Sequence, residues 1–328
     1  MAGLLDGSHD VPLLPFTKAP MGFDLGNNIL VPPGGNVFFV RGNGTSTTEY
    51  DYDPVGVRER LVASVQKALS YCVSGRGDVV YVLEGHTENL ATADSWSNLV
   101  AGVKIIGRGI GTNRPTFTFT TATSTVLLDV ANVVIANCRF LAAGPAGSTP
   151  LSVAAPFTCS AAGNAFISNQ VQIGIDADQL ATAFFTTTAA ADDLLIANND
   201  IYGAATAEVT TCFKFVGNDR LKFVGNKVMG ALATDTDGLL QFITTASTDV
   251  VIADNLLHAN GSGNKTCIQM SANIANTGWI VRNFCRNMTD ANTEWIVTSG
   301  TGVDVQLMDN YGINNSNERG LAIGTASA

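Results

Sequence analysis

The sequence is poor in charged residues, and positive charge is missing from a long central stretch. Only 14% of its 328 residues are Asp, Glu, Lys or Arg, and the formal net charge is −10. No lysine or arginine occurs from Phe140 to Phe213, whereas six acidic residues lie in that stretch. A surface of this kind repels phosphate backbones, so the composition excludes nucleic acid from the expected partners.

Signals for membrane insertion, secretion and metal binding are missing as well. No uninterrupted apolar run is long enough for a transmembrane helix, so we expect no membrane partner. The first residues lack the basic and apolar regions of a signal peptide, which predicts a protein made in the cytoplasm without export. The six cysteines show no CxxC or zinc-like spacing, so we expect buried free thiols, no metal and no cofactor.

One short phrase recurs along the second half of the chain at a nearly constant interval. It consists of apolar residues followed by an asparagine, as in FVGN and IADN, and successive asparagines are 30, 27, 29, 28 and 27 residues apart. An earlier copy, IANC, has Cys138 in the asparagine position. A period of this size is typical of a solenoid in which each repeat forms one turn. The repeated asparagines are Asn169, Asn199, Asn226, Asn255, Asn283 and Asn310.

Each repeat contains three short segments rich in β-branched and aromatic residues. One repeat reads CFKFVG at 212–217, LKFVG at 221–225 and KVMG at 227–230. Segments of four to seven residues have the length of strands, and no helical pattern follows residue 73. Stacking of three strands per repeat predicts an all-β fold, a right-handed parallel β-helix of about seven to nine turns.

The asparagines are expected at a corner between two strands. We expect each of them to adopt the left-handed backbone conformation, which Asn tolerates better than other residues except Gly. Stacked coils would then place the amides in a ladder, in which each amide donates to the next and accepts from the previous one. Because a thiol cannot continue such a ladder, we expect it to start at Asn169 and not at Cys138.

The region before the repeats contains one helical pattern. Val57, Leu61, Val65 and Leu69 fall on one stripe, and Asp53 is placed to cap the first turn. A solenoid exposes unpaired backbone at its ends, so this helix is the expected N-terminal cap. The predicted organisation is an extended anchoring or interlocking arm at 1–52, a capping helix at 53–76, a parallel β-helix at 77–313, and a tail at 314–328 that packs on a partner or over the last coil.

Two groups of polar residues are candidates for chemistry. His86 lies between Glu84 and Glu88, and we interpret the three as solvated groups of a turn, because no third distant ligand closes a metal site. Pairs of aspartates would suit the paired acids of a glycosidase or lyase, or Ca²⁺ ligands, but turn acids in solvent are the favoured interpretation. The candidate acidic site consists of Asp176, Asp178, Asp192 and Asp193, and Asp235 and Asp237 form a further pair.

Three stretches carry a resemblance to a known group of proteins. They are GDVVYVLEGHTENL at 77–90, AGVKIIGRGIGTNRPTFTF at 101–119 and ANVVIANCRFLAA at 131–143. Together they resemble virion structural proteins of tailed bacteriophages of the parallel β-helix, pectate-lyase-like type. The resemblance implies a β-helix and a structural role in the particle, and it carries over no catalytic residue, since the matching positions are turns and strands.

Two functions follow as expectations. The first is a non-enzymatic virion protein, a decoration or spike on the head (capsid), assembled as a homotrimer; its partners would be the phage capsid protein and copies of itself. The alternative is a tailspike or tail-fibre polysaccharide depolymerase, or an adhesin, with a host glycan as partner. Convergence of the four candidate aspartates within about 10 Å beside an aromatic side chain would favour the enzyme.

Overall fold

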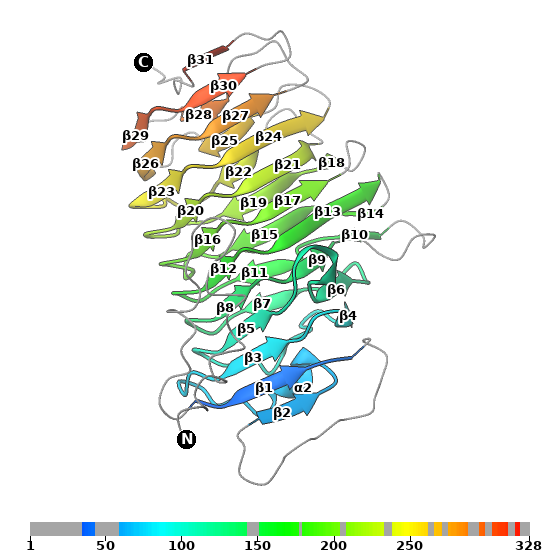
Figure 1. The fold of residues 1–328 in the computed structure, drawn as a ribbon. Helices are drawn as coiled ribbons and strands as arrows, with labels where there is room; N and C mark the ends of the chain where they lie inside the picture. The colour runs from blue at the N-terminus through cyan, green and yellow to red at the C-terminus, as the bar shows by residue number, and fades with distance from the viewer. Residues whose placement is uncertain are drawn as a thin grey trace, which may run out of the picture.

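The computed structural model shows an all-β protein built as a β-solenoid of about seven turns, with 51% of the residues in strands (Figure 1). The predicted β-helix is thereby confirmed. The residues that the structure describes are 35–42, 59–142, 151–176, 179–203, 208–232, 238–261, 266–270, 275–287, 295–298, 304–313 and 319–321.

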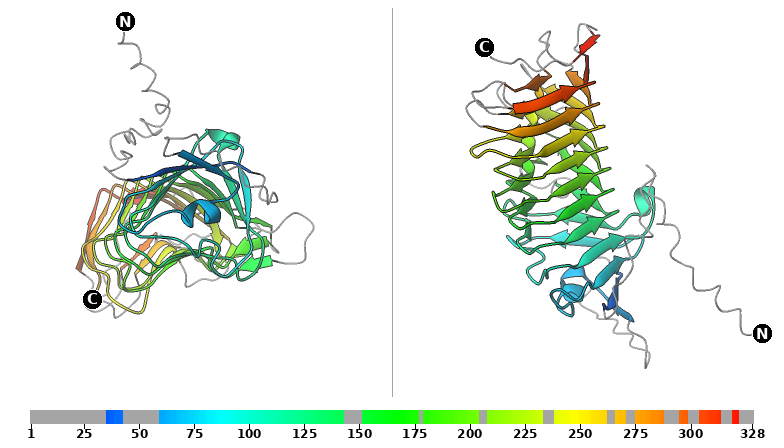
Figure 2. Two further views of the ribbon diagram at one scale, coloured as in Figure 1. Left: turned by 90° about the horizontal axis from the view of Figure 1, so that it is seen from below. Right: turned by 90° about the vertical axis from the view of Figure 1, so that its left-hand side faces the viewer.

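Three sheets form the sides of the solenoid, and the coils from β5 to β28 each contribute a strand to all three sheets (Figure 1, Figure 2). Sheet A contains, in spatial order, β2 (Glu59–Val62), β1 (Val37–Val40), β3 (Val79–Val82), β5 (Lys104–Gly107), β8 (Val134–Ala136), β12 (Ala165–Ile167), β16 (Leu195–Ala197), β20 (Lys222–Val224), β23 (Val250–Ala253), β26 (Thr277–Val281) and β29 (Asp304–Met308). Sheet C contains β7 (Val126–Leu128), β11 (Phe157–Cys159), β15 (Ala183–Thr187), β19 (Thr211–Phe215), β22 (Gly238–Phe242), β25 (Thr266–Met270) and β28 (Ile296–Val297).

Sheet B follows sheet A in every coil. Its main path contains β4 (Thr87–Leu90), β6 (Thr116–Phe119), β9 (Arg139–Leu141), β13 (Gln170–Asp176), β17 (Asp200–Gly203), β21 (Lys227–Leu232), β24 (Leu256–Gly261), β27 (Phe284–Asn287), β30 (Tyr311–Ile313) and β31 (Arg319–Leu321), and β10 (Leu151–Val153), β14 (Gln179–Ala181) and β18 (Glu208–Val209) branch from it. The described strand pairs are parallel except for β13 with β14 and β30 with β31.

Neighbouring coils pair in register, so equivalent side chains form columns along the solenoid. Phe223 of β20 pairs with Ile252 of β23, which pairs with Ile280 of β26, and all three are fully buried. With about 4.8 Å between strands, the eleven strands of sheet A span roughly 48 Å.

The interior is filled by phenylalanines in the first two thirds of the solenoid. Edge-to-face packing is the commonest arrangement of their rings, as between Phe140 and Phe157 (centroids 4.9 Å apart) and between Phe213 and Phe223 (4.9 Å). Stacking of whole coils therefore buries one continuous aromatic core. The fully buried rings are Phe117, Phe119, Phe140, Phe157, Phe166, Phe184, Phe185, Phe213, Phe215, Phe223 and Phe242.

A tryptophan lies in the core near each end of the rod. Trp96 is fully buried against Phe117, with ring centroids 5.4 Å apart, in the first coils. Trp295 is 4% exposed near the C-terminal end, and its Nε1 donates to the carbonyl of Ile313 (3.1 Å). A Cβ at Gly312 would lie 2.2 Å from the Trp295 ring, so glycine is required for this contact.

The N-terminal prediction was wrong in two respects. Residues 37–40, assigned to the extended arm, form β1 within sheet A, and Glu59–Val62, assigned to the capping helix of 53–76, form β2 beside it. The ladder bonds that these residues make to neighbouring strands override the helical stripe of their sequence. Residues 1–34 and 43–58 lie outside the described residues, as does most of the tail 314–328.

The helix itself is short. Helix α2 spans Val65–Leu69, and its N-cap is Ser64, whose side chain accepts from the N–H of Lys67 (3.2 Å). Val65 and Leu69 are buried and join the core, so α2 covers part of the lumen at the N-terminal end, as seen along the axis in Figure 2. The helix thus lies at the end of the solenoid, where a cap was predicted, but it spans Val65–Leu69 and not 53–76. Only one other helical segment is described, the short 3₁₀ turn η2 (Gly111–Asn113).

Candidate functional site

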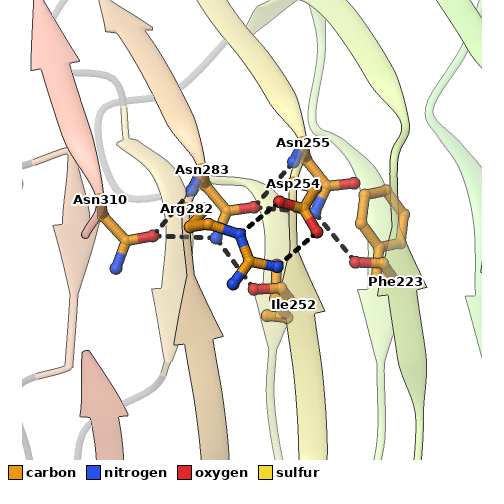
Figure 3. Close-up of polar contacts among 7 residues, drawn as sticks. All are labelled: Phe223, Ile252, Asp254, Asn255, Arg282, Asn283 and Asn310. Atoms are coloured by element: carbon orange, nitrogen blue, oxygen red, sulfur yellow. Dashed lines mark hydrogen bonds and ion pairs between the residues drawn. The ribbon is translucent and has the colours of Figure 1, made fainter. Parts of the chain in front are cut away.

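The six repeated asparagines form a buried column at the corner between sheets A and B, and Figure 3 shows its last three members. Asn255 is representative of the group. Its Nδ2 donates to the carbonyl of Phe223 (2.9 Å) and to Oδ1 of Asn283 (2.8 Å). Its Oδ1 accepts from the backbone N–H (2.8 Å) and Nδ2 (3.2 Å) of Asn226. Each side chain therefore joins the coil before it to the coil after it, and all six are at most 2% exposed.

The left-handed residue of the corner is the one before each asparagine, which corrects the sequence expectation. The asparagines themselves do not have positive φ, whereas the preceding residues have φ between 52° and 67°. The asparagine is thus selected for its side-chain bonds, and the bend is made one position earlier by residues of varied type. These residues are Ser168, Asn198, Gly225, Asp254, Arg282 and Asp309, and Asn137 has the same conformation before Cys138, which occupies the asparagine position.

The first side chain of the polar column is that of Asn169, as expected, and the main chain of the preceding coil bonds to it. The backbone N–H of Cys138 donates to Oδ1 of Asn169 (2.9 Å), and Nδ2 of Asn169 donates to the carbonyl of Ile135 (3.0 Å). A thiol at this position cannot extend the column toward the N-terminus, but its main chain supplies the first donor. The amide-to-amide part of the ladder begins with Asn199, which donates to Asn226 (2.9 Å).

A second, shorter polar column lies at the corner between sheets C and A, and the sequence analysis missed it. The N–H of Asn218 donates to Oγ of Ser247 (3.0 Å), and the N–H of Ser247 donates to Oδ1 of Asn276 (2.9 Å). All three residues are fully buried. Their 29-residue spacing was the available signal, but a serine in the middle position disguised it.

The aspartates of the candidate acidic site that the structure describes, Asp192 and Asp193, bond to residues of the next coil. Asp193 forms a bidentate ion pair with Arg220 of the next coil (2.6 and 2.8 Å), and this bond lowers the pKa of the Asp193 carboxyl. Oδ1 of Asp192 accepts from the N–H of Asp219 (2.9 Å). The catalytic acid of a glycosidase needs a raised pKa, so Asp193 does not have the electrostatics of that role. Asp176 ends β13, but its side chain, like Asp178 and the 235/237 pair, lies outside the described residues.

His86 and Glu88 are not solvated turn groups, contrary to the sequence interpretation. His86 is fully buried and Glu88 is 8% exposed, while Glu84 is exposed. Oε2 of Glu88 lies 3.0 Å from Nε2 of His86 and accepts from the N–H of Val65 (2.9 Å), the first residue of α2. The pair therefore fastens the helix to the first coils from inside the core.

The cysteines behave as small apolar residues. All six are free, five are buried and Cys72 is partly buried. Burial raises the pKa of Cys138 and of Cys212 to about 12, so neither thiol is a nucleophile at neutral pH.

Among the residues that the structure describes, no group of three or more His, Cys, Asp or Glu side chains is arranged to hold a metal ion. None of the described helices has the length and apolarity needed to cross a bilayer. No protein-family model, curated protein or solved structure matches this chain.

Proposed function

We propose that this chain is a non-enzymatic structural protein of a tailed-bacteriophage virion, a decoration or spike on the head assembled as a homotrimer. In this proposal the arm at 1–52 engages capsid subunits or neighbouring copies, and the solenoid is the rod that projects from the shell or lies on it. The motif resemblance of residues 77–143 supports the virion role. A stiff rod of stacked coils supports the mechanical role.

The proposal that the protein is not an enzyme is supported by the bonds that polar side chains make between neighbouring coils. The asparagine column, the most regular polar feature of the chain, is buried and bonded from coil to coil. Asp192 and Asp193, the members of the candidate acidic site whose side chains the structure describes, bond to residues of the next coil. These groups hold coils together, so they are not poised to move protons to or from a substrate.

The location on the particle is tested by cryo-electron microscopy of virions of a phage that encodes this chain. We expect rod-shaped density at three-fold positions of the head, absent from particles made without the gene. Density at the tail tip would overturn the head assignment. Light scattering of the purified protein should give three times the 34.2 kDa of one chain, and a monomer at micromolar concentration would overturn the trimer.

The enzymatic alternative has its own test. Purified protein is incubated with capsular polysaccharides of the host, and we expect neither new reducing ends nor unsaturated sugars. If cleavage occurs, Asp193→Ala is compared with Asp249→Ala, because both aspartates occupy positive-φ turns and only Asp193 belongs to the candidate acidic site. Selective loss of cleavage in Asp193→Ala would establish a depolymerase and refute the structural role as the whole function.

A further inference from the structure

Two buried thiols lie close together near the C-terminal end of the solenoid. Cys267 belongs to β25 of sheet C, and Cys285 belongs to β27 of sheet B in the next coil. Both side chains are fully buried, and a side-chain hydrogen bond joins the two thiols. Sγ of Cys267 lies 3.7 Å from the carbonyl oxygen of Arg286, the residue that follows Cys285. It also lies 3.5 Å from the carbonyl oxygen of Leu257, which pairs with Cys285 in the ladder of sheet B.

The repeat provides a matched thiol that has no such neighbour at the equivalent position. The register of sheet C places Cys212 two coils before Cys267 in the same inward column. The register of sheet B places Val228 two coils before Cys285. Cys212 is fully buried as well, but a valine occupies the position that corresponds to the second cysteine. The thiol pair is therefore a feature of one position in the rod and not of the repeat.

The surroundings of the pair keep it reduced until an oxidant reaches it. The hydrogen bond with Cys267, together with burial, raises the pKa of Cys285, so this thiol holds its proton at neutral pH. Because the thiolate is the reactive form, oxidation should be slow at neutral pH and faster in alkaline buffer. Strand β25 is next to β28, with which the path of sheet C ends, and coils near the end of a solenoid open more readily than central ones.

We propose that Cys267 and Cys285 form an oxidation site, at which a peroxide or a small disulfide converts the two thiols into a disulfide between consecutive coils. With hydrogen peroxide, one thiol becomes a sulfenic acid and a first water leaves. The sulfur of the other thiol then attacks the sulfenic sulfur, and its proton leaves with the hydroxyl group as a second water. The two electrons lost by the thiols reduce the O–O bond. With oxidised glutathione, two exchange steps form the same bond and release two molecules of the reduced thiol.

The disulfide would fasten the last coils of the rod to each other covalently. Cys267 and Cys285 are 18 residues apart, and a cross-link that closes a loop of this size stabilises a protein by constraining its unfolded chain. For a chain of 328 residues the expected rise in the thermal midpoint is roughly 4 °C. The pair stays reduced in a reducing compartment and closes in an oxidising one, whichever function the rod has.

The test is peptide mapping of the full chain after oxidation. One sample of folded protein is treated with hydrogen peroxide in alkaline buffer, and a second is unfolded in urea and refolded in a mixture of reduced and oxidised glutathione. Remaining thiols are then alkylated. Trypsin cleaves after Lys265, Arg282 and Arg286, so the peptides 266–282 and 283–286 stay together only through the disulfide. We expect this linked product from both samples, and its separation by dithiothreitol.

Two alanine variants provide the comparison, because each removes one fully buried thiol. Cys285→Ala should abolish the linked product and the rise in thermal midpoint of the oxidised over the reduced form. Cys212→Ala is the matched control and should keep both. Circular dichroism measures the midpoints and checks that both variants are folded.

The refolded sample decides the question, because every thiol is accessible before the coils close. Absence of the linked product from this sample, or its appearance no more often than disulfides that contain Cys212, would overturn the proposal. A product in the refolded sample and none in the peroxide sample would overturn it for the assembled rod. An oxidised form with a midpoint no higher than that of the reduced form would overturn the stabilising effect of the cross-link.

Discussion

Removal of one amide from the middle of the asparagine column should destabilise the whole rod. In Asn255→Ala, the carbonyl of Phe223 and the N–H and Nδ2 of Asn226 lose their bonds to this side chain. Nδ2 of Asn226 keeps its bond to the carbonyl of Ile196 (2.9 Å), and the carbonyl of Phe223 still faces β23 in the parallel ladder, so the N–H of Asn226 is the buried backbone group left without a partner. At about 1 to 3 kcal/mol for such a group, the expected loss in the free energy of unfolding is about 1 to 3 kcal/mol.

The assay is thermal and urea unfolding of the purified protein, followed by circular dichroism. For a chain of 328 residues that unfolds as one unit, about 0.7 kcal/mol corresponds to one degree, so the thermal midpoint should fall by about 1 to 4 °C. Asn98→Ala is the matched control, because Asn98 is exposed and its replacement should change stability by less than about 0.5 kcal/mol.

Asn255→Asp separates hydrogen bonding from packing. The aspartate has the shape of asparagine but cannot donate to the carbonyl of Phe223 unless it is protonated, and its charge would be buried at a site that is 2% exposed. We expect it to be at least as destabilising as alanine at neutral pH and less so in acid. Equal stability of wild type, Asn255→Ala and Asn255→Asp would refute the assignment of the column as a structural element.

Three further predictions concern the ends and the core. Gly312→Ala should disturb the last coil, because its Cβ would lie 2.2 Å from the ring of Trp295, and tryptophan emission should shift to the red. Burial alone would raise the pKa of Asp78, but hydrogen bonds from Arg76 and from backbone N–H groups outweigh it and lower the pKa. That stabilisation is present above the ordinary aspartate pKa and is lost as the pH falls below about 4, so Asp78→Asn should remove this part of the acid sensitivity, measured as unfolding midpoint against pH. Phe213→Ala should cost about 3 to 5 kcal/mol in urea unfolding, because the ring is fully buried in the aromatic core.

The repeat could be predicted from the sequence because two physical demands coincide at one position. The asparagine must bond to two coils and is buried, so no other side chain replaces it from Asn169 to Asn310. The bend itself is invisible in the sequence. Positive φ is carried by residues as different as Ser168, Gly225 and Arg282, so the residue type does not mark the position of the bend.

The parts that could not be predicted depend on contacts between distant segments. Val65 and Glu88 are 23 residues apart, and nothing local indicates that the carboxylate caps the helix from within the core. Strands β1 and β2 likewise acquire their conformation from pairing with each other and with β3. A four-residue strand has too little pattern of its own to outweigh the helical stripe through Leu61 and Val65.

The residues that break the repeat gather at the ends of the rod, and this distribution has one physical cause. Inside the solenoid each coil makes the same hydrogen bonds to its two neighbours, so an asparagine suits the corner between sheets A and B in every coil. At the N-terminal end those bonds are replaced by irregular ones, the Glu88 contact to α2 and the Asp78 contacts to Asn36 and Val73. At the C-terminal end Trp295 fills the lumen and β31 covers sheet B, while β29 remains unpaired among the described strands.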